Sequence, residues 1–390
     1  MVPQVRVSFV LLLAVLSAAD AVSPKKAAKF RLWLDERGAL GSGHLRIGKT
    51  PRGLRGVMTT RGYNAEDAMF ALPLSAAIKL GPVDWPRPTG GLPTTRAGYE
   101  AMLNVLRSSR WKPYARLLPK LSDCMLPDCW SDAELAELRE PELVAVVREK
   151  QGQLRALYDR LRRDFDKKLR FDKFMRAHFL LQTRIFGVSL SKGSGGKEIG
   201  FQVPMVDFLN TDDAPNARLV LGDDDATTGM PSTVFVVAER AIAQGAEVTI
   251  DYGGSLKPIK RLLNFGMLPA VGLEWRGVEV GGNPWDYKPL WCIDAVAMHE
   301  LTSEHVDALR QRLRQYDAPT PVGGEQQQLW ELEVAADASL SAAVQRRRAL
   351  ANAYRMRCRQ GIAWALHGLA PRRTSWPDPG AGLTGVSAIY

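Results

Sequence analysis

Two short segments in the second half of the chain constrain its fold most strongly. The first, Val203–Thr211, is an apolar run that closes with an Asp and an Asn. The second, Val248–Gly253, alternates apolar and polar residues and ends in Tyr-Gly. Period-two alternation predicts a half-buried strand, and Asp and Asn are typical of turns and caps. Each segment alone is a weak signal, so their order and separation carry the information.

The composition indicates an ordinary soluble globular protein. The chain has 390 residues, of which 46% are hydrophobic and 24% are charged. This length favours about two or three domains. A net charge of +10 favours acidic partners, nucleic acid among them. Because the Arg and Lys residues are spread along the chain, we interpret the charge as a solvated basic surface and expect no specific nucleic-acid partner.

The cysteines and histidines form no metal motif. The four cysteines include no CxxC pair, which disfavours a zinc ribbon. The five histidines lack metal-ligand spacing, and no Ser-His-Asp order or nucleophile elbow is visible. The sequence therefore predicts no metal site and no catalytic triad.

The N-terminus has the pattern of a cleavable signal peptide. Arg6 precedes the apolar run Val7–Leu16, and a segment of small residues ends at Ala21. The run is too short to cross a bilayer comfortably, and no other segment approaches a transmembrane helix. We expect residues 1–21 to be a secretory-type signal. It leads either to the endoplasmic reticulum and secretory pathway or to a plastid reached through that pathway.

Apolar spacing predicts the elements of the globular part. A short helix is expected within 28–41, and the strands Gly53–Arg61 and Ala68–Pro73 are expected to pair as a hairpin. Further on the spacing turns helical, and Ser131 with Glu134 predicts a capping box. The other expected elements are a loop at 81–93, a long helix at 140–168, a flexible loop at 191–197, strands at 233–237 and 247–250, and helical regions near 300–316 and 325–367.

This order of elements, with several local phrases, resembles one branch of the SET-domain methyltransferases. The branch is that of the Rubisco large-subunit lysine methyltransferase-like proteins, which include the actin histidine methyltransferases. The supporting phrases are Trp111–Tyr114 with a Leu-Pro pair after it, Thr183-Arg184, the Val203–Thr211 segment, and Tyr252-Gly253 with Gly266 shortly after. The match spans residues 30–367, and the combination is specific although each phrase is not.

The resemblance implies an α+β fold, with a SET-type β-fold that carries a helical insertion and is followed by an all-α C-terminal substrate-binding domain. The implied division is a signal peptide at 1–21, an N-terminal SET portion at 30–95, a helical insertion at 96–182, a C-terminal SET portion at 183–288, a helical substrate-binding domain at 289–370 and a disordered tail at 371–390.

The resemblance also implies S-adenosyl-L-methionine (AdoMet) as the cofactor and Tyr252 as the catalytic residue. A lysine amine, with an ordinary pKa of about 10.4, must lose its proton before it attacks a methyl group, and a narrow apolar channel favours the neutral amine. A tyrosine hydroxyl can hold that amine in attack geometry. The implied cofactor-binding residues are Gly53, Leu54, Arg55, Gly56, Arg184, Asp207, Phe208, Leu209, Asn210, Thr211 and Phe265.

The chain departs from the family pattern at several of these positions. Thr211 stands where His is common, Lys257-Pro258 replaces a usual Asn, and Met267 replaces a usual aromatic residue. Threonine keeps a backbone contact but loses the imidazole. The departures bear on the shape of the substrate channel more than on AdoMet binding.

We therefore expect a monomeric, AdoMet-dependent protein-lysine N-methyltransferase whose C-terminal helices present the protein substrate. A protein-histidine N-methyltransferase is the alternative within the enzyme class, because sequence does not fix the lining of the acceptor channel. A non-catalytic SET-like protein-binding module is the alternative outside that class, motivated by Thr211 and by the changes over 257–267. A basic nucleic-acid binder is a further reading that rests on charge alone.

Overall fold

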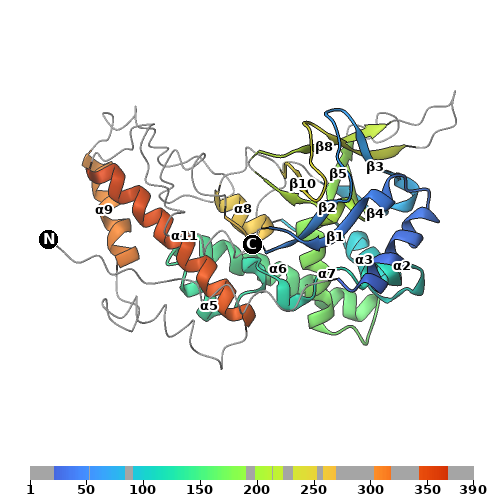
Figure 1. The fold of residues 1–390 in the computed structure, drawn as a ribbon. Helices are drawn as coiled ribbons and strands as arrows, with labels where there is room; N and C mark the ends of the chain where they lie inside the picture. The colour runs from blue at the N-terminus through green and yellow to red at the C-terminus, as the bar shows by residue number, and fades with distance from the viewer. Residues whose placement is uncertain are drawn as a thin grey trace. The chain divides into compact units, whose positions relative to one another are not determined.

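The chain folds into two compact units. The strand-rich unit comprises Ala18–Cys124 and Lys150–Leu256, and the helical unit comprises Met125–Glu149 and Lys257–Tyr390 together with Met1–Ser17. None of the helices in the described stretches combines the length and the apolar character that a membrane span requires. The computed structural model describes residues 22–51, 53–83, 91–189, 198–212, 214–222, 232–252, 258–268, 303–317 and 342–367 (Figure 1).

The described strands of the strand-rich unit form three sheets. Strand β9 shows why these segments are strands, since the buried Val234, Val236 and Ala238 alternate with the half-buried Phe235 and Val237. In sheet order the strands are β1 (Leu45–Lys49), β2 (Arg55–Thr59), β10 (Glu247–Ile250) and β7 (Asn210–Thr211); β3 (Ala68–Pro73), β9 (Thr233–Ala238) and β8 (Ala217–Gly222); and β4 (Ile78–Val83), β6 (Glu198–Gln202) and β5 (Phe186–Ser189).

The hairpin predicted between Gly53–Arg61 and Ala68–Pro73 is wrong. Strand β2 pairs antiparallel with β1, and β3 pairs with β9 in another sheet. In the β1–β2 turn, the Thr50 N–H donates to the Leu54 carbonyl at 2.7 Å, and Gly53 has a φ of +81°. Glycine adopts this left-handed conformation without strain, so Gly53 belongs to a turn. The true partner was missed because β1 is short and three of its five residues are polar or glycine.

Helices pack against these sheets with strongly apolar faces. Tyr99, Met102 and Leu103 of α3 are almost completely buried, which confirms the helix predicted from their spacing. Helix α2 begins at Pro24, after the N-cap Ser23, earlier than the predicted 28–41 helix. The helices of this unit are α2 (Pro24–Asp35), α3 (Arg96–Arg107), α4 (Lys112–Ala115) and α7 (Phe171–Arg184), with 3-10 turns η2 (Ser42–His44), η3 (Leu74–Ala76), η4 (Ser109–Trp111), η5 (Leu121–Asp123) and η7 (Val206–Phe208).

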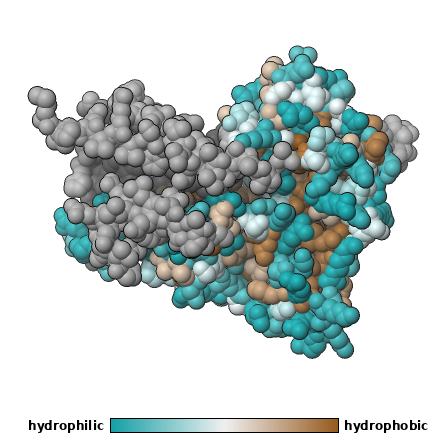
Figure 2. Space-filling view, turned by 60° about the horizontal axis from the view of Figure 1, so that its bottom comes forward, coloured by the Kyte–Doolittle hydropathy of each residue, from teal (hydrophilic) through white to brown (hydrophobic). Residues whose placement is uncertain are grey.

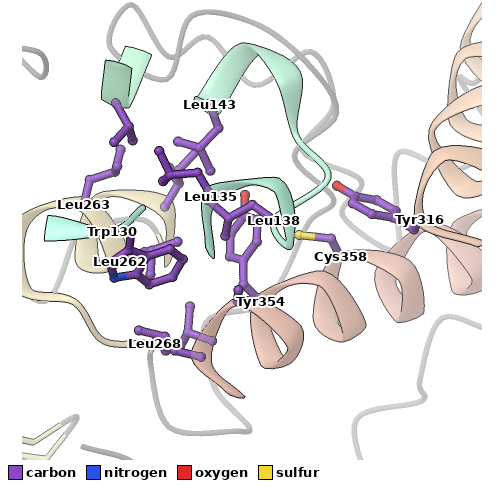
Figure 3. Packing of buried hydrophobic residues seen from close by; sticks show 14 of the residues in the cluster. Trp130, Leu135, Leu138, Leu143, Leu262, Leu263, Leu268, Tyr316, Tyr354 and Cys358 are labelled. Atoms are coloured by element: carbon purple, nitrogen blue, oxygen red, sulfur yellow. The ribbon is translucent and has the colours of Figure 1, made fainter. Parts of the chain in front are cut away.

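The helical unit has a core of its own. Its described elements are η6 (Pro127–Cys129), α5 (Asp132–Ala136), α8 (Pro258–Phe265), α9 (Ser303–Asp317) and α11 (Ala342–His367), and α6 (Pro141–Asp164) begins in this unit. The predicted capping box is present, with Ser131 as N-cap and Glu134 reaching back to it. The core side chains come from all of these helices, as Figure 3 shows for Trp130, Leu135, Leu138, Leu143, Leu262, Leu263, Leu268, Tyr316, Tyr354 and Cys358.

Several predicted segments fall partly or wholly outside the described residues. The signal at 1–21, the loop at 191–197 and the tail at 371–390 lie outside them. Of the helical regions predicted near 300–316 and 325–367, the described parts are the helices at 303–317 and 342–367, and residues 325–341 lie outside the described residues. The first three residues of the loop predicted at 81–93 belong to β4, which continues to Val83, and residues 84–90 lie outside the described residues. The division into SET portions, insertion and substrate-binding domain stays a prediction, and residues 125–149 of the predicted insertion belong to the helical unit.

The described surface is mainly hydrophilic. Figure 2 shows hydrophilic residues over most of the visible described part, with hydrophobic residues in strips between them. The large hydrophobic side chains that are exposed within the described residues are Leu32, Leu40, Phe171, Val220 and Met356.

A buried ion pair gives a test of the helical unit. The Arg312 guanidinium donates to the Glu140 carboxylate at 2.8 Å, with 6% and 9% of the two side chains exposed. Arg312→Met should lower the free energy of unfolding by about 3 kcal/mol, because it removes the cation from a buried carboxylate. Urea denaturation followed by tryptophan fluorescence measures the loss.

The matched control is Arg148→Met in the same unit. Arg148 pairs with Asp132 at 3.0 Å, but both side chains are more than half exposed. This variant should lose less than about 1 kcal/mol, because water screens the pair. Equal losses for the two variants would contradict the assignment of Arg312 to the core.

Candidate functional site

The two segments that the sequence singled out lie side by side in one sheet. Strand β10 pairs antiparallel with β2 on one side and parallel with β7 on the other. In the parallel pair, Thr249 lies opposite Asn210 and Ile250 lies opposite Thr211. Because both strands run in the same direction, they leave the sheet at the same edge. Tyr252 follows β10 at that edge.

Tyr252 is held by both its hydroxyl and its backbone. The hydroxyl donates to the backbone carbonyl of Leu209 at 2.5 Å, and the N–H donates to Oγ1 of Thr211 at 3.3 Å. Thr211, which departs from the family pattern, therefore positions Tyr252 through its hydroxyl. Burial raises the pKa of Tyr252 to about 12, with Arg184 opposing the rise and nearby carboxylates adding to it. Tyr252 keeps its proton near neutral pH and serves as a hydrogen-bonding group, not as a base.

Asn210 is fixed against β2 by its side-chain amide. Nδ2 donates to the backbone carbonyl of Arg55 at 3.1 Å and to the Glu247 carboxylate at 2.8 Å. Gly56 leaves room for this arrangement, since a Cβ there would lie 2.6 Å from Nδ2 of Asn210 and 2.8 Å from Oε1 of Glu247. With both amide hydrogens engaged, Oδ1 is the atom of Asn210 that can accept a hydrogen bond from a ligand.

Asp207 is the buried centre of a polar network beside these strands. Its Oδ2 accepts hydrogen bonds from the Tyr114 hydroxyl at 2.7 Å and the Gln202 amide at 3.2 Å. The Arg184 guanidinium lies 3.4 Å from the same oxygen and donates to the Asp207 backbone carbonyl. Burial raises the pKa of Asp207, and Arg184 is the main opposing influence. Asp207 therefore braces Arg184 and the η7 turn and does not face solvent.

The η7 turn also places an aromatic ring between two cations. Met205, just before the turn, has a φ of +78°, which is uncommon for a residue other than glycine. Phe208 follows, and the guanidinium carbons of Arg55 and Arg184 lie 5.5 and 5.4 Å from its ring centroid. These are cation–π distances, so Phe208 holds both arginines near the site. Backbone strain of this kind is often found at functional sites.

Two polar atoms of the site, Nε of Arg184 and Oδ1 of Asp207, are fully buried and have no hydrogen-bond partner among the described residues. The Asp207 side chain is closed off from solvent, whereas 17% of the Arg184 side chain is exposed. The Arg184 guanidinium and Oδ1 of Asn210 are therefore the polar groups of the site that remain for a ligand. In the part of the chain that the structure describes, no group of three His, Cys, Asp or Glu side chains could hold a metal ion.

The structure gathers most of the predicted site residues, namely those of β2, η7 and β7 together with Arg184 and Tyr252. Gly53 and Leu54 lie instead in the β1–β2 turn, where Gly53 is exposed. Phe265 is the last residue of α8 in the helical unit, and its predicted place beside the cofactor stays a prediction. Gly253 and Lys257 lie outside the described residues.

Three polar residues of the site were not predicted to belong to it. Tyr114 was noted only as part of a family phrase, and Gln202 and Glu247 were not singled out. Tyr114 lies 93 residues from Asp207, and Glu247 lies 37 residues from Asn210. A polar residue at the end of an apolar strand is a usable signal for Gln202 and Glu247, but their partners emerge only from the sheet pairing.

Comparison with known proteins supports the fold. No family model matches the chain. The chain is 26% identical over 188 residues to the curated protein Plastid transcriptionally active 14 of Arabidopsis thaliana. That alignment covers 45% of this chain and only 35% of the relative, so the chain spans much less than the relative's full length.

Two solved structures are similar over most of the chain. One is the SET domain of LSMT bound to lysine and AdoHcy, with a TM-score of 0.58 and 15% identity. The other is Rubisco LSMT bound to AdoMet, with a TM-score of 0.56 and 14% identity. Each alignment covers 89% of this chain and 91% of the solved chain. The predicted α+β class is confirmed, and the chain has the SET fold in the form found in Rubisco LSMT.

Proposed function

We propose that the chain is an AdoMet-dependent protein-lysine N-methyltransferase with Tyr252 as its catalytic residue. The observation that carries the proposal is the parallel pairing of β10 with β7. It brings Tyr252 beside Asn210, where the Tyr252 hydroxyl donates a hydrogen bond to the Leu209 carbonyl. The solved proteins of similar fold are bound to AdoMet, or to lysine with AdoHcy, which supports the same class of reaction here.

The residues around Asn210 fit AdoMet. When bound, AdoMet supplies a methyl group activated by a positively charged sulfur. Oδ1 of Asn210 would accept from its ammonium group, and the partly exposed Arg184 guanidinium would attract its carboxylate. The backbone of Phe208–Thr211 would serve the polar edge of the adenine, as the family resemblance implies.

Tyr252 would orient the acceptor amine. Its proton is committed to the Leu209 carbonyl, so the lone pairs of its oxygen remain to accept a hydrogen bond from the amine. The amine nitrogen then keeps its own lone pair for the methyl group. Because the pKa of Tyr252 is about 12, the amine must lose its proton by another route, and desolvation in the channel favours that loss. Fixing two reactants in attack geometry can lower a barrier by roughly 7–11 kcal/mol.

Tyr252→Phe tests this role. The variant keeps the ring and removes the hydroxyl, so the rate of methyl transfer should fall by about a hundredfold or more while AdoMet affinity stays within about twofold. Labelled AdoMet, the purified chain and a protein extract give the rate as label in a protein band, and calorimetry gives the affinity.

The pH profile separates an orienting Tyr252 from a basic one. The wild-type rate should rise with pH as the acceptor amine loses its proton, and the residual rate of Tyr252→Phe should rise in the same way. An unchanged rate in the variant, or loss of the rising limb, would contradict an orienting role.

Gly56→Ala tests the architecture under the cofactor. The new Cβ would crowd Asn210 and Glu247 inside a buried strand, so AdoMet affinity should fall by about tenfold or more. Gly43→Ala is the control, because a Cβ at Gly43 would meet no atom within 4 Å. Calorimetry on both variants measures the difference. Equal affinities would show that Asn210 is not a ligand of AdoMet.

The side chain that accepts the methyl group distinguishes a lysine methyltransferase from a histidine methyltransferase. Lysine is favoured here because the similar solved SET domain is bound to lysine. Mass spectrometry of the labelled protein would identify the modified side chain, and methylhistidine in place of methyllysine would replace this part of the proposal. Absence of AdoMet binding at millimolar concentration would favour the non-catalytic module.

We also propose that the helices of the helical unit present the protein substrate and that the chain acts as a monomer.

We propose a plastid as the compartment of the chain. The secretory-type signal predicted at 1–21 leaves open the secretory pathway and a plastid reached through it, and the plastid in the name of the curated relative favours the plastid. Imaging of a fluorescent fusion of the whole chain tests the compartment. A signal confined to the endoplasmic reticulum or secretory pathway would contradict it.

A further inference from the structure

Basic residues that are far apart in the sequence gather on one surface of the strand-rich unit. The first part of this surface is a hollow of about 460 Å³ at α3 and α4. Arg107, Lys112, Arg116, Lys120 and Arg176 line it, and none of the residues that line it is acidic. Burial lowers the pKa of Arg176, which donates to the backbone carbonyls of Ala115, Leu118 and Pro119. Arg176 thus forms a fixed floor, and the other four side chains are exposed.

The second part of the surface is a hollow of about 410 Å³ at the connection between α6 and α7. Arg162, Lys167, Lys168 and Arg170 line it and are exposed. Asp172 is the acidic residue of its lining, and both Arg170 nitrogens that face it donate to its carboxylate. The hollow therefore keeps a net positive charge.

An ion pair joins the two hollows. Arg107, from the first hollow, donates to Asp166 at 2.5 Å, and Asp166 directly precedes Lys167 of the second. The Arg107 guanidinium also lies 5.9 Å from the ring centroid of Phe165. We call the linings of the two hollows, linked by this ion pair, the basic surface.

Most acidic residues near the basic surface pair with an arginine, namely Asp159, Asp164, Asp166 and Asp172. Asp123, whose charge acts on Arg176, accepts instead from the backbone N–H of Lys120. These pairs leave lysines that face solvent without a carboxylate partner among the described residues. They are Lys112, Lys120, Lys167 and Lys168. Such side chains suit an extended anion that makes several contacts at once.

An exposed aromatic ring at the second hollow favours a nucleic acid over an acidic peptide as the anion. Phe171 is 40% exposed, although it lies in a described surface that is mainly polar. The Arg155 guanidinium lies 5.2 Å from the ring centroid of Phe171 and 5.4 Å from that of Tyr158. Phe171 also packs against Tyr158 and Phe174, with ring centroids 5.1 and 6.1 Å apart. Its exposed part is what remains for a nucleobase to stack on. An acidic peptide has no flat base to use it.

We propose that the basic surface binds single-stranded nucleic acid without sequence preference. The four lysines, with Arg116 and Arg162, contact the phosphates of the strand. Phe171 stacks with a base. This activity is separate from the proposed methyl transfer and does not rest on it, because neither AdoMet nor Tyr252 takes part.

The test uses the full chain and a fluorescein-labelled oligo(dT) of about 20 nucleotides, with binding followed by anisotropy at several salt concentrations. Two variants each remove two charges, Lys112→Gln/Lys120→Gln in the first hollow and Lys167→Gln/Lys168→Gln in the second. Each should weaken binding by about tenfold at roughly 50 mM salt and reduce the slope of log K against log salt by about 1.4. Circular dichroism confirms that the variants are folded.

The control Lys49→Gln/Lys79→Gln removes two charges from exposed positions on β1 and β4, and it should leave binding within about twofold. Phe171→Leu should weaken binding by about fivefold and leave the salt slope unchanged, because stacking releases no counterions. Support requires salt-dependent binding that both hollow variants weaken and the control does not. Absence of binding, equal losses in the control, or equally tight binding of poly-glutamate would overturn the proposal.

Discussion

The parallel pairing of β7 with β10 is the interaction on which the site depends. Strand β7 is only two residues long, so the backbone hydrogen bonds between β7 and β10 contribute little to holding the two strands together. Side chains hold β10 at two further points, through Asn210 of β7 and through Asn216, which lies just before β8. The Asn216 amide donates to the Glu247 carbonyl at 2.8 Å and accepts from the Thr249 N–H at 2.9 Å, while the Glu247 carboxylate accepts from Asn210. These bonds lie in a partly buried environment, where leaving one of them unmade is costly. The positions of Asn210 and Tyr252 therefore rest on polar clamps more than on strand length.

The sequence predicted the elements better than their pairing. Apolar spacing located α3, β3, β9 and β10, and the Ser131 capping box was recognised because its residues are local. The β2–β3 hairpin was wrong because sheet partners are chosen by tertiary packing. At the site, Asp207, Asn210 and Tyr252 came from the family resemblance. Tyr114, Gln202 and Glu247 were missed because polar residues acquire such roles only through distant partners.

The positions of the charged residues in the fold could likewise not be predicted from the sequence. The densest cluster in the sequence, at 346–348, is not a free basic patch, since Arg347 is buried and donates to the Cys129 carbonyl. Residues of the basic surface are separated by up to 69 positions, from Arg107 to Arg176, yet they line two joined hollows. Because they are spread along the sequence, the sequence analysis interpreted them as an ordinary solvated basic surface. The fold brings them together as the linings of two hollows.

The central claim is that the pairing of β7 with β10 builds an AdoMet site whose reacting end faces Tyr252. A crystal structure of the chain with AdoHcy tests it most directly. The account predicts AdoHcy against Oδ1 of Asn210 and Arg184, with its sulfur on the side of the Tyr252 hydroxyl. AdoHcy bound elsewhere, or absent at millimolar concentration while Asn210 keeps its bonds to Arg55 and Glu247, would contradict it.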